Sequence, residues 1–192
     1  SPEFAPAYAH LGRFLRRKGR ASDSAAAFDT AIRKALYPAS MILVAQALQS
    51  DQRFADSVKL LKKVLSQDAN NPAALILLGR GFTSVGAYTD AEVVLRKASM
   101  ITVGGVSGWS GLAELYLRVG KPDAAEDALL KAARFADGSD RFELARLFAA
   151  VGDAFLKTGG QVAAERAFRK ARELNPELAA DAVKVTRGKG KN

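Results

Sequence analysis

The sequence predicts an all-α fold, a right-handed α-solenoid of five helix-turn-helix units. Two observations lead to this prediction. A pattern of large and small side chains recurs with a period of 34 residues along the 192-residue chain, and a fixed period of this kind indicates a stacked array. Glycine also recurs at the place in the unit where one helix must stop and the chain must reverse. Each unit is therefore expected to bury its apolar face against its neighbours.

The predicted units span about residues 5–37, 38–71, 72–105, 106–139 and 140–176. Residues 1–4 precede the pattern and look like a cloning scar. Residues 177–185 are expected to form a short capping helix, because the last unit of a stack would otherwise expose an apolar face. We therefore predict a single domain over residues 5–185, followed by a solvated basic tail over residues 186–192.

The first helix of each unit carries large residues at places four, seven and eleven, a spacing that puts them on one buried face. Place eight is always glycine or alanine, so that the paired helix can approach closely. Place four holds Tyr8, Met41, Leu75, Trp109 and Phe148; place seven holds Leu11, Val44, Leu78, Leu112 and Val151; place eight holds Gly12, Ala45, Gly79, Ala113 and Gly152.

The second helix repeats a small, large, small pattern at places 20, 24 and 27, with Phe28 and Leu61 as the first two large residues. Four of the five turns between paired helices hold glycine, and Gln52 stands at this place in the second unit. An insertion of five residues precedes the fifth unit. It is expected to lengthen the following helix by more than a turn, with Ser139 as the capping residue.

This pattern resembles the tetratricopeptide repeat, and the resemblance covers the chain from about Ala5 to Pro176. The proline expected near the end of each unit appears only as Pro176. The resemblance implies that the first helices line a concave side that binds protein. The third unit carries the signature best, with Leu75, Leu78, Gly79, Phe82, Gly86, Tyr88, Ala91, Leu95 and Ala98.

The resemblance also implies which side chains face a bound partner. Guanidinium and amide groups surround two isoleucines in the first half, which suits an extended peptide with acidic and apolar side chains. The acidic end of such a peptide is expected near Arg13, Arg16 and Arg80. The full set of predicted partner-binding residues is Arg13, Arg16, Ile42, Gln46, Gln49, Ile76, Arg80, Thr83, Glu114, Leu117 and Asp153.

The composition argues against catalysis and against bound metals. There is no cysteine, and His10 is the only histidine, so zinc sites of the Cys/His type and histidine-based triads cannot form. A transmembrane helix needs about 20 consecutive apolar residues, and every apolar run in this sequence is much shorter. We therefore predict no enzymatic activity, no cofactor, no metal, no small-molecule substrate and no membrane span.

The leading functional prediction is a protein-interaction scaffold. The alternative is a self-associating structural module of a larger assembly, such as secretion, envelope or pilus machinery. A weaker alternative is nucleic-acid binding, because the net charge is +9 and basic residues cluster near both ends. The compartment stays open because the natural N-terminus is missing, with the cytoplasm slightly favoured over the periplasm.

Overall fold

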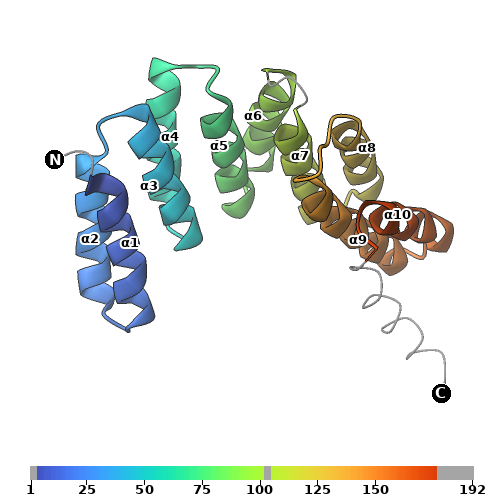
Figure 1. Ribbon diagram of the computed structural model, residues 1–192, viewed down its shortest axis with the longest axis horizontal. Helices are drawn as coiled ribbons and strands as arrows, with labels where there is room; N and C mark the ends of the chain where they lie inside the picture. The colour runs from blue at the N-terminus through green and yellow to red at the C-terminus, as the bar shows by residue number, and fades with distance from the viewer. Residues whose placement is uncertain (1–3, 102–104, 177–192) are drawn as a thin grey trace. The chain divides into compact units, whose positions relative to one another are not determined.

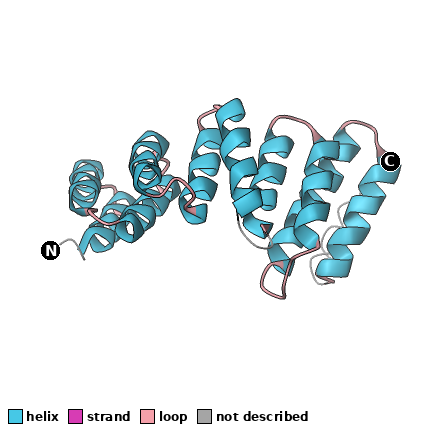
Figure 2. Ribbon diagram, turned by 90° about the horizontal axis from the view of Figure 1, so that it is seen from above, coloured by secondary structure: helices cyan, strands magenta, loops and turns pink. Residues whose placement is uncertain are grey.

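The computed structural model describes residues 4–101 and 105–176, and the elements in this part of the chain are helices joined by turns and loops (Figures 1 and 2). They form five consecutive antiparallel pairs, which confirms the predicted all-α architecture. The pairs are α1 (Ala5–Arg17) with α2 (Ala21–Lys34), α3 (Pro38–Ser50) with α4 (Phe54–Gln67), α5 (Pro72–Ser84) with α6 (Tyr88–Ile101), α7 (Val106–Arg118) with α8 (Pro122–Ala133), and α9 (Arg141–Lys157) with α10 (Gln161–Leu174).

The chain divides into two compact parts, which we call the N-terminal half (up to Val94) and the C-terminal half (from Leu95). The predicted capping helix over residues 177–185 and the predicted tail over residues 186–192 lie outside the described residues, as do residues 1–3 of the predicted scar.

The turn inside four of the pairs depends on a glycine with positive φ. The φ values are 74° at Gly19, 81° at Gly86, 73° at Gly120 and 82° at Gly159. Gln52 takes the same left-handed conformation, with a φ of 63°, although a side chain is disfavoured there. The α3–α4 turn therefore has the same backbone geometry as the other four turns, although it contains no glycine at this place.

Proline is the first helical residue at three of the helix starts. Pro38, Pro72 and Pro122 each stand at a first helical position, where the missing N–H costs nothing. The Asn71 side chain accepts a hydrogen bond from the backbone N–H of Ala74 at 3.0 Å. These residues fix where α3, α5 and α8 begin.

The insertion before α9 lengthens that helix but is not capped as predicted. α9 has 17 residues and α7 has 13, so the predicted extra turn is confirmed. The prediction for Ser139 is wrong, because its hydroxyl donates to the Asp137 carboxylate at 2.6 Å instead of capping the helix. Asp140 occupies the N-cap position without a side-chain cap hydrogen bond.

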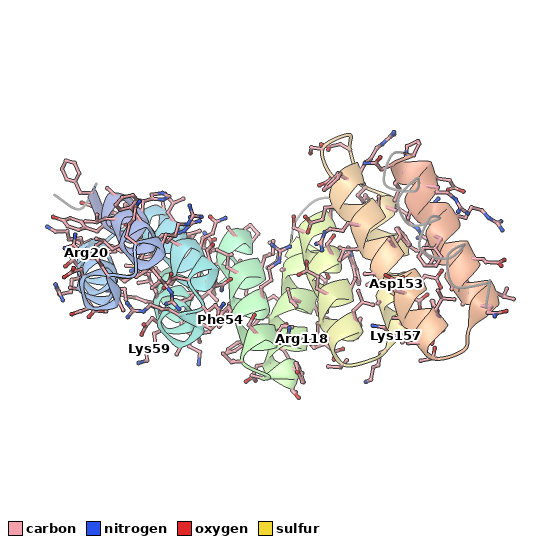
Figure 3. All side chains as sticks on the ribbon, turned by 90° about the horizontal axis from the view of Figure 1, so that it is seen from below. Arg20, Phe54, Lys59, Arg118, Asp153 and Lys157 are labelled. Atoms are coloured by element: carbon pink, nitrogen blue, oxygen red, sulfur yellow. The ribbon has the colours of Figure 1, made fainter. Side chains whose placement is uncertain are left out.

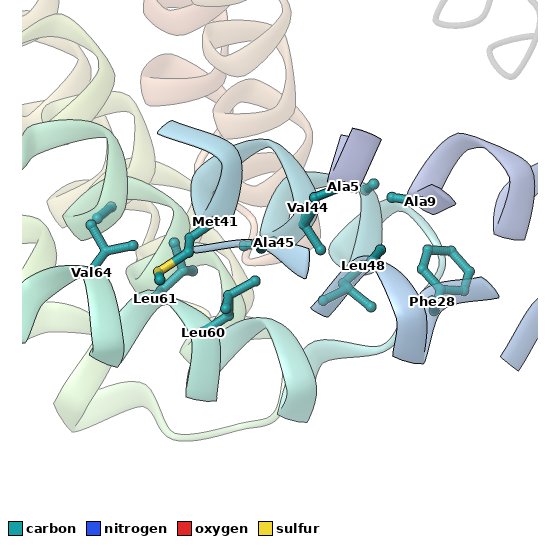
Figure 4. Close-up of a cluster of buried hydrophobic side chains, with 14 of the residues drawn as sticks. Ala5, Ala9, Phe28, Met41, Val44, Ala45, Leu48, Leu60, Leu61 and Val64 are labelled. Carbon is teal, nitrogen blue, oxygen red and sulfur yellow. The ribbon is translucent and has the colours of Figure 1, made fainter. Parts of the chain in front are cut away.

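The core of the N-terminal half is a single hydrophobic cluster to which α1 to α5 all contribute side chains. Its large members include Phe28, Met41, Leu48, Leu61 and Val64 (Figure 4). The small residues lie where the pattern places them. A Cβ atom added at Gly12 would stand 2.8 Å from Phe28 Cδ2, closer than real Cβ contacts allow. The absence of a side chain therefore lets α1 and α2 cross closely.

The C-terminal half repeats this arrangement. A Cβ atom added at Gly152 would stand 2.7 Å from Phe168 Cε1, at the crossing of α9 and α10. One added at Gly111 would stand 2.7 Å from Leu95 Cδ2, where α7 approaches α6. Leu129 and Phe148 are fully buried in this half.

The first unit departs from the predicted pattern at one large residue. Leu11 was expected on the buried face of α1, but it is 44% exposed, whereas Val44 at the same place in α3 is fully buried. The reason is position in the array. Val44 lies on a helix that packs against α1 and α2, and α1 is the first helix of the described chain.

Candidate protein-interaction face

The residues predicted to bind a partner all lie on the first helix of a pair, and each of them is exposed or half-buried. Their side chains can therefore be reached from solvent to different degrees. Arg13 and Arg16 lie on α1; Ile42, Gln46 and Gln49 on α3; Ile76, Arg80 and Thr83 on α5; Glu114 and Leu117 on α7; and Asp153 on α9.

In the N-terminal half the three first helices lie next to one another, because α1 packs against α3 and α3 against α5 (Figure 1). The predicted residues of this half are thus carried by consecutive helices. None of the three helices contains an aspartate or a glutamate, and α1 and α5 carry arginines. We call the exposed surface of Arg13, Ile42, Gln46, Ile76 and Arg80 the peptide face.

Two of the predicted residues hold the helices together. The Arg16 guanidinium donates to Asp51 at 2.8 Å, and the Asp51 side chain is only 7% exposed. The Gln49 amide donates from Nε2 to the carbonyl of Leu77 at 2.7 Å. A buried carboxylate and a backbone carbonyl both need such partners. Arg16 and Gln49 therefore serve α1–α3 and α3–α5 packing before they could serve a ligand.

The remaining predicted polar residues of the N-terminal half differ in burial and in their hydrogen-bond partners. Arg13 is half-buried and has no ion-pair partner among the described residues. The Thr83 hydroxyl donates to the carbonyl of Gly79 at 2.9 Å, within its own helix. Gln46 is exposed on α3. Gln46 is thus the most accessible polar residue of the peptide face, and Arg13 and Arg80 are half-buried.

In the C-terminal half the first helices α7 and α9 also pack against one another. The Glu114 carboxylate lies 3.6 Å from the Arg146 guanidinium, which is also 3.8 Å from Glu143. Asp153 is exposed on α9, as is Lys157 four residues later (Figure 3). The charges here are mixed in sign, unlike those of α1, α3 and α5.

Sequence reasoning missed the ion pairs between second helices. Arg53 binds Asp29 and Asp56 at 3.0 and 2.6 Å and stacks over the Phe28 ring at 5.3 Å. Burial opposes the charge on Arg53, but the hydrogen bonds to the two carboxylates outweigh that effect and raise its pKa. The acids lie 24 and 3 residues away, and only the longer of these separations links two pairs.

A second such link joins α8 to α10. Arg166 donates two hydrogen bonds to the Glu126 carboxylate, one of them from Nε at 2.8 Å, and these bonds raise the pKa of Arg166. Glu126 is buried, so the fork of the guanidinium satisfies both carboxylate oxygens. No periodic signal in the sequence marks this contact, which spans 40 residues.

The described residues contain no cluster of histidine and acidic side chains that could hold a metal ion. A hollow of about 300 Å³ near the α1–α2 turn is lined by Arg16, Ser24, Phe28, Asp51 and Arg53. Its charged groups all have partners, since Arg16 binds Asp51 and Arg53 binds Asp29 and Asp56. None of the described helices is long and apolar enough to cross a bilayer.

Comparison with known proteins identifies solved structures with a similar fold. No family model and no curated protein matches the sequence. Solved structures do match: a crystal structure of MamA has 20% identity and a TM-score of 0.65, covering 88% of this chain and 97% of that one.

Two further structures are similar to the same extent. TTC0263, a thermophilic TPR protein of Thermus thermophilus, has 17% identity and a TM-score of 0.65 over 95% of this chain and 97% of that one. A putative kinesin light chain of Podospora anserina with nearly identical TPR-like repeats has 17% identity and a TM-score of 0.64, over 93% and 98%. The resemblance read from the 34-residue pattern is thereby confirmed, and the chain has the tetratricopeptide-repeat fold.

Proposed function

We propose that the chain is a protein-interaction module that holds an extended segment of a partner protein on the peptide face of the N-terminal half. The observation that carries the proposal is the charge of α1, α3 and α5, which include arginines but no carboxylate. Helices that carry arginines and no acid of their own favour an acidic ligand. No catalytic role is part of this proposal.

The chemistry of the face defines the ligand class further. Ile42 and Ile76 are half-buried and offer apolar contact on neighbouring helices, while Arg13 offers a charged donor near one end. A peptide that alternates leucine or isoleucine with aspartate or glutamate matches both features. Most of its binding energy is expected from a few side chains, as is usual for such interfaces.

The test is a titration of fluorescent peptides of this alternating type, read by anisotropy. The binding variant combines Arg13→Ala with Arg80→Gln, and Arg16 is left intact because its loss would strand the buried Asp51. We expect the Kd of the tightest peptide to rise about tenfold or more, since each lost charged hydrogen bond contributes about 1.5 to 3 kcal/mol.

The matched control replaces two exposed cations on second helices, Arg33→Ala with Lys63→Gln. It removes the same charge from the molecule but leaves the peptide face intact, so its Kd should stay within about twofold of the parent at 0.15 M salt. Equal losses in both variants would mean that the peptide senses only net charge. That result, or the absence of binding by any acidic peptide, would refute the proposal.

The other functional classes predict different outcomes in the same samples. Nucleic-acid binding predicts affinity for random oligonucleotides that falls steeply with salt. Self-association predicts a sedimentation coefficient that rises with protein concentration while the peptide leaves it unchanged. Either behaviour without peptide binding would favour that class over the one proposed.

A further inference from the structure

A stripe of apolar side chains on α1 lies open to solvent. Leu11 is 44% exposed and Phe14 is 56% exposed, and Ala7 is exposed as well. Their spacing of three and four residues places them on one side of the helix. Lys18 continues this side by one more turn, with its ammonium 5.8 Å from the Phe14 ring centre. We call these four residues the outer face of α1.

The corresponding residues of other first helices are covered. Val44 and Ala47 stand at the places of Leu11 and Phe14 in α3, and both are buried, on a helix that packs against α1 and α2. At Gly81 of α5, which stands at the place of Phe14, an added Cβ atom would meet Gln49 of α3 at 3.0 Å and Val58 of α4 at 3.3 Å. What covers this side of a first helix is thus the preceding helix pair.

The same holds in the C-terminal half. Leu112 and Leu115 stand at the places of Leu11 and Phe14 in α7, and both are buried. Gly111, directly before Leu112, lies against Leu95 of α6. The outer face of α1 therefore has the position and the apolar character of surfaces that elsewhere in this chain receive a helix pair.

Charged residues at the edge of this face indicate what kind of helix pair would fit it. Arg20 stands at the place of Arg53, 33 residues earlier, at the turn between α1 and α2 (Figure 3). Arg53 binds Asp56 in its own pair, and it also binds Asp29 of the preceding pair. Arg20 makes only the first of these contacts, with Asp23 at 2.6 Å, and its side chain stays 63% exposed.

Lys18 supports the same comparison. It stands at the place of Asp51, which binds Arg16 on the first helix of the preceding pair. The sign is reversed at Lys18, so a neighbour would need an acid where α1 has Arg16. An incoming helix pair would thus need an aromatic residue followed by an acid on its second helix. These two residues would contact Arg20 as Phe28 and Asp29 contact Arg53.

We propose that the outer face of α1 is a second interaction surface, and that it receives a helix pair of the same repeat type with an acidic face. A second copy of this chain does not fit. A parallel pair of α1 helices would bring the Arg17 and Lys18 side chains of both copies together, and in an antiparallel pair α1 offers Lys18 no acid, because it contains no aspartate or glutamate. On α10, Phe168 is followed by Arg169, which would repel Arg20. The occupant is therefore a different helix pair, and its binding does not depend on the peptide face.

The test supplies this neighbour as a designed probe. A copy of residues 5–37 is added ahead of Ala5 in the full chain, with Arg16 of the copy changed to glutamate to oppose Lys18. The copied Phe28 and Asp29 are then in the positions, relative to Arg20, that Phe28 and Asp29 have relative to Arg53. We expect the midpoint of thermal unfolding to rise by about 5 °C or more, since Leu11 and Phe14 become buried.

Two controls separate docking from mere lengthening. Leu11→Glu with Phe14→Glu in the receiving helix should shift the unextended chain by less than about 2 °C, because both side chains are exposed there, yet abolish the gain in the extended chain. Changing Asp29 of the copy to arginine should remove part of the gain. An equal gain in all extended chains would overturn the proposal.

Other occupants would be recognised in the unextended chain. If it bound vesicles of phosphatidylserine and phosphatidylcholine, and the Leu11→Glu, Phe14→Glu variant did not, the face would belong to a lipid surface. If it formed dimers that this variant abolished, the face would belong to a second copy. Either result would overturn the proposal, whereas a monomer that leaves vesicles unbound supports it.

Discussion

At the scale of single residues, helix crossings in this chain are set by pairs of side chains whose sizes compensate. Gly12 meets Phe28 and Gly152 meets Phe168, whereas the units with alanine at the same place, Ala45 and Ala113, have leucine instead of phenylalanine on the second helix. A ring thus requires a glycine opposite it, because packed interiors leave no room for both.

This compensation makes a testable prediction for the first pair. Gly12→Ala places a methyl group 2.8 Å from the Phe28 ring, and we expect it to lower the free energy of unfolding by about 1 to 3 kcal/mol. Phe28→Leu alone also destabilises, by leaving a gap. The double variant should be more stable than the two separate losses predict, as measured by urea unfolding in a double-mutant cycle. Simple additivity would contradict it.

A second prediction concerns the α8–α9 connection. The hydroxyl and backbone N–H of Ser139 both donate to the Asp137 carboxylate, and they lower its pKa. A lowered pKa in the folded chain means that this contact stabilises the fold above the ordinary pKa of aspartate and is lost as the pH falls through the folded value. In Ser139→Ala the Asp137 pKa should move up toward the ordinary value of aspartate, as followed by NMR titration. An unchanged pKa would contradict this cause.

At the scale of elements, the turns between paired helices keep one geometry with two kinds of residue. Gln52 has a φ of 63°, close to the values of the four turn glycines. A residue with a Cβ atom in this region carries a backbone cost of about 1 to 2 kcal/mol. The α3–α4 turn is thus held in shape by the packing of its helices rather than by its own preference.

Gln52→Gly should therefore stabilise the chain. The relief of strain is partly offset by the greater freedom of glycine in the unfolded state, so we expect a gain of about 0.5 to 1 kcal/mol in urea unfolding. The matched control is Gly86→Gln, at the same place in the α5–α6 turn, which should lose a similar amount. A loss of stability in Gln52→Gly would show that the Gln52 side chain makes a compensating contribution.

At the scale of the whole molecule, stability is distributed over successive helix pairs, since each element packs mainly on its neighbours in sequence. The large buried side chains are accordingly shared among all five pairs, from Phe28 in α2 to Phe148 in α9. A local defect is expected to loosen the pairs around it before it affects distant ones.

Leu48→Ala tests this expectation. Leu48 is fully buried in α3, and its truncation should cost about 2 to 5 kcal/mol in the N-terminal half. Amide hydrogen exchange should speed up in α1 to α4 while α9 and α10 keep their protection. Leu144→Ala in α9, also fully buried, is the reciprocal control. Equal acceleration along the whole chain in either variant would mean that the array unfolds as one unit.

The sequence by itself determined the helix pairs and the turns of this protein. These depend on local spacing: large residues on one helical face, a glycine or alanine at each crossing, and a residue that accepts positive φ between paired helices. Such features act within about 34 residues, so they can be read from one repeat and checked against the next. The exceptions, Ser139 and Leu11, lie where the period is interrupted or begins.

Only the tertiary structure decided which predicted surface residues are available to a partner. The pattern predicted Arg16 and Gln49 as partner-binding residues in the same way as Arg13 and Gln46. In the structure, however, Arg16 binds Asp51 and Gln49 binds the carbonyl of Leu77, each on the next helix pair. The same is true of the exposed outer face of α1, whose residues match buried ones elsewhere. Periodicity gives each position its direction, but whether a neighbour fills the space in that direction depends on contacts between units that the local pattern does not contain.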